Sequence, residues 1–183
     1  VNTNSIELTV DSLQKLAYEY LKSDVSESHK ICRELFLIST QEKNKFVLAV
    51  ANNLKADILT HKGEYEFAID YYLKAILLYE ALNNKSKLPF VHRNISSVYQ
   101  YMGDYSTAIK HLKLSEKIFV DNNDSLGLAY TFNIFGNVYR ELGNDSLSLF
   151  YHRRCYNFAV DIKDTSLIAI SSLNIAGSLD YIE

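Results

Sequence analysis

Apolar residues recur along most of the chain at intervals of three and four, the spacing that places side chains on one face of an α-helix. One well-defined stretch carries two such stripes, separated by Gly143: Leu128, Phe132, Phe135, Tyr139 and Leu142, then Leu147, Phe150, Tyr151, Cys155, Phe158 and Ala159. The whole pattern predicts nine helices, at residues 9–22, 26–40, 44–61, 65–82, 86–101, 105–121, 125–141, 145–161 and 165–182.

The pattern repeats every 40 residues. Two independent sets of residues keep this step: Gly63, Gly103 and Gly143, and Asn44, Asn84, Asp124 and Asp164. The glycines lie where a first helix has to end in a left-handed residue, and the Asn and Asp residues lie where helix N-caps belong. Each repeat is therefore predicted to be a pair of antiparallel helices. Because a lone pair cannot bury its apolar stripe, we expect the pairs to stack.

The predicted fold class is all-α, a right-handed α-solenoid of antiparallel helix pairs in a single domain over residues 1–183. We assign a degenerate capping repeat to 1–40, full repeats to 44–82, 84–121 and 124–161, and the first helix of a further repeat to 164–183. A terminal cap needs a polar outer face. Because Ile170 and Leu173 are apolar, we expect the repeat array to continue beyond this sequence.

Composition narrows the classes of function. The chain has 183 residues, 48% of them hydrophobic, and a net charge of −3, so it can bury a large core but offers no basic surface for nucleic acid or anionic lipid. No run of about 18 apolar residues is present, so this segment is not expected to span a membrane. Cys32 and Cys155 lie far apart and are expected to be buried thiols rather than a disulfide or a metal cluster.

No enzyme site is apparent. None of the five histidines (His29, His61, His92, His111 and His152) lies three or four residues from another, so no metal site forms on one helix face. We expect no metal, no cofactor and no catalytic residue. His61 and Glu64 flank a turn and are interpreted as surface and capping residues, and the cluster His152-Arg153-Arg154 is interpreted as surface charge.

Small and aromatic residues recur at fixed positions of each pair. The first helix has a small residue followed three positions later by a large one: Ala56 and Leu59, Ser96 and Tyr99, Gly136 and Tyr139. The second helix has two small residues seven apart: Ala68 and Ala75, Ala108 and Ser115, Ser148 and Cys155. This pattern resembles the tetratricopeptide repeat, in a variant with a 40-residue period. The chain departs from the family in lacking Trp, and in His152, which stands where the other repeats have Tyr72 and Leu112.

The resemblance implies that the first helix of each pair lines a concave face that binds peptides. The candidate groove residues are Asn53, Asp57, His61, Phe90, Arg93, Ser97, Gln100, Tyr101, Tyr130, Asn133, Asn137, Arg140 and Glu141. Amide side chains can donate to and accept from a peptide backbone, and aromatic rings supply apolar contact. One alternative is a merely solvated face. Another is a carboxylate clamp of Asn53, Arg93, Asn133 and Asn137, which Asp57 disfavours because it repels an anion.

The segment from Asn133 to Asn144 is similar to repeats in bacterial sensory proteins, in which such arrays precede a histidine kinase or a helix-turn-helix output domain. This resemblance implies a scaffold that binds a protein or peptide, as the sensor or interaction segment of a larger bacterial regulatory protein. It also implies a periplasmic location, with a cytoplasmic one as the alternative. The segment itself is not expected to be an enzyme, although a kinase domain could lie outside it. The competing hypothesis is a self-associating solenoid that forms homo-oligomers.

Overall fold

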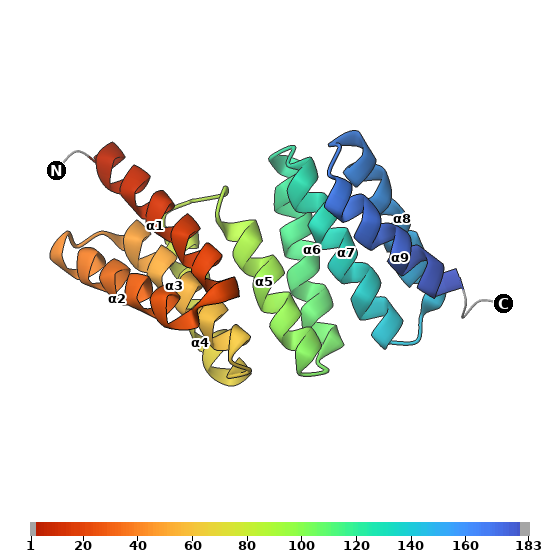
Figure 1. Cartoon of the computed structure of the whole chain (residues 1–183), viewed down its shortest axis with the longest axis horizontal. Helices are drawn as coiled ribbons and strands as arrows, with labels where there is room; N and C mark the ends of the chain where they lie inside the picture. Colours follow the sequence, from red (N-terminus) through yellow and green to blue (C-terminus); the bar gives the residue numbers. More distant parts are fainter. Residues whose placement is uncertain (1–2, 180–183) are drawn as a thin grey trace. The chain divides into compact units, whose positions relative to one another are not determined.

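A computed structural model describes residues 3–179, and within that range it contains nine α-helices and no strand (Figure 1). The helices are α1 (Thr3–Ser23), α2 (Val25–Gln41), α3 (Lys45–His61), α4 (Tyr65–Ala81), α5 (Leu88–Tyr101), α6 (Tyr105–Asp121), α7 (Ser125–Glu141), α8 (Asp145–Asp161) and α9 (Thr165–Leu179). The predicted all-α fold is confirmed, and most helix ends agree with the prediction within a residue or two. The predicted helical residues 180–182 lie outside the described residues.

The chain divides into two compact units, residues 1–87 with α1–α4 and residues 88–183 with α5–α9. We call them unit 1 and unit 2. The boundary falls directly before α5, so it separates no helix from its partner in a pair. The sequence contains no linker-like segment at this point, and the single domain over residues 1–183 stays a prediction.

Within each repeat, the turn after the first helix is closed by a glycine in the left-handed region. Gly63, Gly103 and Gly143 have φ of 75°, 78° and 70°. At the first of these turns the Gly63 N–H donates to the Thr60 carbonyl and the Glu64 N–H donates to the Leu59 carbonyl, at 3.0 and 2.9 Å. These two bonds satisfy carbonyls that the helix end leaves open. The prediction for the three glycines is confirmed.

The turn after the second helix uses the same backbone conformation without glycine. Lys43, Asn83, Asn123 and Lys163 have φ between 48° and 57°, again at a step of 40 residues. The sequence does not predict these four positions, because Lys gives no signal for a left-handed residue. Asn tolerates this conformation through its short polar side chain, whereas Lys carries the full steric cost of its Cβ.

Most of the predicted N-caps are confirmed. The side chains of Asn44, Asp124 and Asp164 accept backbone N–H groups in the first turns of α3, α7 and α9. Asn84 differs, because its side chain accepts from the Lys87 N–H while α5 begins only at Leu88. The predicted start of this helix at residue 86 is therefore two residues early, and Asn84 stabilises a turn that precedes the helix.

In unit 1 the core is built around α3, which packs against α1, α2 and α4. Contact on three sides explains why α3 is buried on more than one face. Leu54 and Ile58 are completely buried, and Phe46 packs edge-on against Tyr79 of α4 with ring centroids 6.3 Å apart.

In unit 2 the corresponding central helix is α7, which packs against α5, α6, α8 and α9 (Figure 1). Phe132 and Phe135 of α7 are completely buried. The ring of Tyr151 from α8 stacks on that of Phe135 with centroids 4.6 Å apart. Because α5 and α9 both contact α7, the first helices of the successive pairs form one layer of unit 2. None of the described helices is long and apolar enough to cross a membrane.

Candidate functional site

The layer formed by α5, α7 and α9 in unit 2 carries a row of exposed apolar side chains, one on each helix. Phe90, Tyr130 and Ile170 occupy equivalent positions 40 residues apart and are 38%, 39% and 45% exposed. A large apolar side chain therefore stays partly exposed at the same position of each of these three helices, and other apolar residues of the layer, such as Leu126 and Leu173, are exposed as well. We call this set the exposed row.

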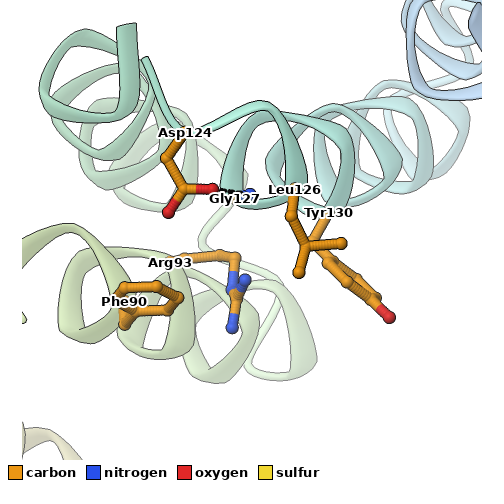
Figure 2. Close-up of a pocket in the computed structure, with 6 residues that line it drawn as sticks. All are labelled: Phe90, Arg93, Asp124, Leu126, Gly127 and Tyr130. Atoms are coloured by element: carbon orange, nitrogen blue, oxygen red, sulfur yellow. Dashed lines mark hydrogen bonds between the residues drawn. The ribbon is translucent and has the colours of Figure 1, made fainter. Parts of the chain in front are cut away.

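A pocket of about 190 Å³ opens between α5 and α7, at the first two members of the exposed row (Figure 2). Its lining consists of Phe90, Arg93, Asp124, Leu126, Gly127 and Tyr130. The pocket lies wholly within unit 2. Beside it, Phe119 of α6 packs against Gly127, where an added Cβ would come within 2.3 Å of the ring, and edge-on against Phe90 at 4.9 Å between centroids. The buried Phe119 thus supports two residues of the lining.

Arg93 is the cation of this pocket. The centre of its guanidinium group lies 5.3 Å from the Phe90 ring centroid and 5.5 Å from that of Tyr130, so it is held between two aromatic faces. The one carboxylate of the lining, Asp124, accepts the Gly127 N–H at 2.7 Å and caps α7 (Figure 2). The pocket therefore combines apolar walls with a positioned guanidinium group.

The predicted amides lie further along the same layer. The Asn133 amide oxygen accepts from Asn174 of α9 at 3.0 Å, and the Asn137 amide oxygen accepts from Arg140 at 3.4 Å. All four side chains are partly exposed. Of the other predicted groove residues in unit 2, Ser97 and Gln100 are partly exposed, and Tyr101 and Glu141 are exposed at the ends of their helices. The structure thus gathers the unit 2 candidates on one layer.

The three candidates of unit 1 behave differently. Asn53 and Asp57 are only 5% and 9% exposed. The Asp57 carboxylate accepts from Tyr18 of α1 at 2.6 Å and from Tyr72 of α4 at 2.5 Å, and Asn53 donates to both Tyr18 and Asp57. These contacts place Asn53 and Asp57 in the interior of unit 1, where they join three helices. They are not exposed groove residues, and the carboxylate-clamp alternative loses Asn53.

Burial and the neighbouring Asp57 charge raise the pKa of Tyr18 and of Tyr72 well above its usual value. Both phenols therefore stay protonated and remain donors to the carboxylate. His61, the third candidate of unit 1, is exposed at the end of α3, and Glu64 is an exposed residue at the start of α4. Both are surface residues, as predicted, and Glu64 occupies the N-cap position of α4, but its side chain makes no capping hydrogen bond.

The interpretation of His152-Arg153-Arg154 as surface charge is wrong for His152, which is completely buried. It fills the interior position that Tyr72 and Leu112 occupy in the other repeats, and burial lowers its pKa to about 4. Arg154 is partly buried, lies over the Phe132 ring at 3.9 Å and pairs with Glu116 of α6 at 3.3 Å. The position of His152 within the repeat therefore decides its burial, although two arginines follow it in the sequence.

The remaining candidate chemistry is limited. Cys32 and Cys155 are buried free thiols, as predicted, and burial raises the pKa of each to about 11, which keeps them protonated. Across residues 3–179 no group of three or more His, Cys, Asp and Glu side chains is placed to hold a metal ion. The structure does bring His92 of α5 to His111 of α6, a contact between helices that a search for spacings within one helix cannot find.

Comparison with known proteins places this architecture in a class. The tetratricopeptide repeat family model matches residues 47–121. No curated protein sequence matches the chain. The protein is a helical-repeat scaffold, and the segment 47–121 consists of tetratricopeptide repeats, as the resemblance implied.

Solved structures extend the similarity of fold over nearly the whole chain. Aspartyl phosphate phosphatase F from Bacillus subtilis is 19% identical with a TM-score of 0.80, over 95% of this chain and 47% of that one. The apo form of RapI is 21% identical with a TM-score of 0.77, over 94% and 68%. A signal-transduction ATPase with a tetratricopeptide repeat sensor from Pyrococcus horikoshii is 14% identical with a TM-score of 0.73, over 91% and 27%. The chain spans about half the length of the phosphatase.

Proposed function

We propose that the α5–α7–α9 layer of unit 2 binds an extended peptide segment of a partner protein. The observation that carries this proposal is the pocket between α5 and α7, where the exposed rings of Phe90 and Tyr130 flank the Arg93 guanidinium group. Its volume suits one apolar side chain of the ligand. The guanidinium group would favour a carboxylate beside that side chain, through charge-assisted hydrogen bonds.

The rest of the layer fits the backbone of such a peptide. Asn133, Asn137 and Asn174 present amide groups along α7 and α9, and an amide can both donate to and accept from a peptide group. Ile170 continues the exposed row on α9 and offers a second apolar contact one repeat further on. Recognition would thus combine one apolar anchor, one acidic neighbour and hydrogen bonds to the main chain.

We further propose that this array serves as the sensor or interaction segment of a larger bacterial regulatory protein. Support comes from the names of the structurally similar proteins, which include an aspartyl phosphate phosphatase and a signal-transduction ATPase with a repeat sensor. In such a protein the peptide would change the geometry of the array and so the activity of the attached output domain. This role depends on peptide binding but goes beyond it.

The test begins with a display library of random 12-residue peptides, selected against the folded chain at pH 7. We expect enriched peptides to carry an apolar residue next to Asp or Glu. Tyr130→Ala and, separately, the double change Asn133→Ala with Asn137→Ala should each weaken binding at least about tenfold, a loss of more than about 1.4 kcal/mol. Arg93→Gln should remove the preference for the acidic residue.

A matched control is Phe67→Ala, which removes an exposed ring on α4, outside the proposed site. It should leave peptide affinity unchanged. Circular dichroism of every variant checks that helicity is kept. If the selected peptides bind Tyr130→Ala and the Asn133/Asn137 variant as well as they bind the wild type, the site assignment is refuted.

Self-association is the second candidate function, and one observation favours it. The side chain of Leu173 on α9 is 74% exposed, and that of Ile170, three residues earlier on the same side of the helix, is 45% exposed. Such an apolar helix face could pair with its copy in a second chain. Sedimentation velocity of the wild type and of Leu173→Glu decides the matter: a dimer that the substitution abolishes supports the hypothesis, and a monomeric wild type eliminates it.

A further inference from the structure

Two histidines face each other between the helices of the first repeat of unit 2. The Nδ1 atoms of His92 on α5 and His111 on α6 are 3.0 Å apart, a hydrogen-bonding distance, and the ring centroids are 5.2 Å apart. His92 is 5% exposed, and the ring of Tyr99 stacks on His111 at 5.6 Å and 9°. The pair is therefore part of the packing between α5 and α6.

The next repeat fills the same positions with rings that do not titrate near neutral pH. Phe132 and Tyr151 stand 40 residues after His92 and His111, with ring centroids 6.1 Å apart, and Tyr139 stacks on Tyr151 as Tyr99 stacks on His111. Packing alone therefore does not require imidazoles at this place. The two histidines differ from these rings in one respect: the strength of their contact depends on how many protons the pair has bound.

The proton count of the contact is specific. In the neutral pair one ring carries its proton on Nδ1 and donates it to the unprotonated Nδ1 of the other ring. One added proton can enter at the Nε2 atom of the donor ring and leaves this bond in place. A second added proton has to enter at the accepting Nδ1, which places two N–H groups and two positive charges against each other at 3.0 Å. The second proton therefore turns an attraction into a repulsion.

Among the described helices packed around the pair, no nearby acidic side chain is placed to offset a positive charge on both imidazole rings. Burial, followed by the neighbouring His111, lowers the pKa of His92 to about 4, and burial lowers that of His111. Charged groups of the packed helices are engaged or exposed elsewhere. On α5, Arg93 lies between Phe90 and Tyr130, and on α6, Glu116 pairs with Arg154 of α8. On α7, Asp124 caps its own helix and Arg140 donates a hydrogen bond to Asn137. The remaining charged residues of these helices are exposed: Lys110, Lys113, Lys117 and Asp121 of α6 and Glu141 of α7.

We propose that His92 and His111 form a proton-operated latch that holds α5 against α6 at neutral pH and releases it when both rings are protonated. Release would separate the helix that carries Phe90 and Arg93 from the helix that carries Phe119, on which Phe90 packs. The latch would therefore also dismantle the pocket between α5 and α7. It stands on the geometry of the pair, whether or not that pocket binds a peptide.

The test is amide hydrogen exchange from pH 6.5 to pH 4.5, corrected for the intrinsic pH dependence of exchange. We choose the background His152→Leu, because His152 is the other histidine of unit 2 and is itself buried. In this background, opening of residues 88–121 should increase at least about tenfold as the pH falls, since protons bind the open pair more tightly than the closed one. Residues 125–161 should change less.

The matched control is His92→Phe with His111→Tyr, which copies the pair found in the next repeat. This variant should lose the pH dependence of opening in residues 88–121. If it does not fold, His92→Asn with His111→Tyr copies the residues of the preceding repeat, Asn52 and Tyr71, and replaces it. An equal increase in opening with and without the histidines, or an increase spread evenly over unit 2, would overturn the proposal.

Discussion

Gly136 lies directly against His152. A Cβ atom added at Gly136 would lie 2.4 Å from Cε1 of the His152 ring, closer than any carbon contact tolerates. In the preceding repeat the same two positions hold Ser96 and Leu112. The buried imidazole and the missing side chain are therefore a matched pair, and the glycine is explained by packing rather than by backbone conformation.

The first prediction concerns the sign of one substitution in two backgrounds. Gly136→Ala in the wild type should destabilise unit 2 by about 1–2 kcal/mol, because overpacking outweighs the gain in helix propensity. In the background His152→Leu the same change should stabilise by up to about 1 kcal/mol, since the propensity gain then remains. Urea denaturation of the four proteins measures both values. The same sign in both backgrounds would contradict the steric explanation.

The second prediction is a dependence of stability on pH that originates at His152. Burial, with Arg140 as a smaller cause, lowers the pKa of His152 to about 4, whereas the unfolded chain has the ordinary value of about 6.5. The unfolded state therefore binds the extra proton first, and stability falls as the pH drops from about 6.5 to about 4. At pH 5 the loss from this one group is about 2 kcal/mol.

Neither ring nitrogen of His152 has a hydrogen-bond partner within the described part of the chain. Leu at this position removes the unsatisfied polar atoms, so His152→Leu should leave the protein at least as stable at pH 7. The variant should also lose about 2 kcal/mol less than the wild type between pH 7 and pH 5. His61→Leu, at an exposed histidine, is the control and should not change the pH dependence.

The third prediction tests the buried network of unit 1. Tyr18→Phe removes one of the two phenol donors to the Asp57 carboxylate and leaves the aromatic packing intact. A hydrogen bond to a buried charged group contributes about 2 kcal/mol, so the variant should lose that much stability toward urea. Tyr20→Phe, two residues further along α1, serves as the control and should cost less than about 0.5 kcal/mol. Equal losses for the two variants would argue against the network.

The helices, their order and most of their ends could be predicted from the sequence, because the 40-residue step, the glycines and the apolar stripes all indicate the same elements. It also placed Phe90, Tyr130, Asn133 and Asn137 together on one layer. Side-chain spacing on one helix, however, does not say which neighbouring helix covers it. Asn53 and Asp57 have the same register as partly exposed residues of unit 2, yet Tyr18 and Tyr72 from two other helices cover them.

The contact between His92 and His111 could not be predicted from spacing along one helix either. A search for ligand or proton pairs three or four residues apart on one helix excludes positions 19 residues apart, although the turn between the two helices brings these together. The repeat register could have found the pair, because Phe132 and Tyr151 stand at the equivalent positions in the next helix pair. Comparing repeats is thus more informative here than examining local spacing.

The last prediction concerns the left-handed residues at the turns between repeats. Lys163 has φ of 57°, in a region that costs a residue with a Cβ about 1–2 kcal/mol. Lys163→Gly relieves this strain but adds chain entropy to the unfolded state, so the expected net stabilisation is about 0.5–1 kcal/mol. Gly143→Ala makes the opposite change at the turn inside the preceding repeat, where φ is 70°, and should destabilise by about 1 kcal/mol.

Thermal and urea denaturation of both variants measure these differences directly. No atom lies within 4 Å of a Cβ built at Gly143, and Lys163 is exposed, so side-chain contacts do not complicate the comparison. Asn123→Gly is a further control, expected to gain less than Lys163→Gly because Asn already tolerates the left-handed conformation. A loss of stability in Lys163→Gly, or no loss in Gly143→Ala, would show that the backbone conformation at these turns is not what selects the residue.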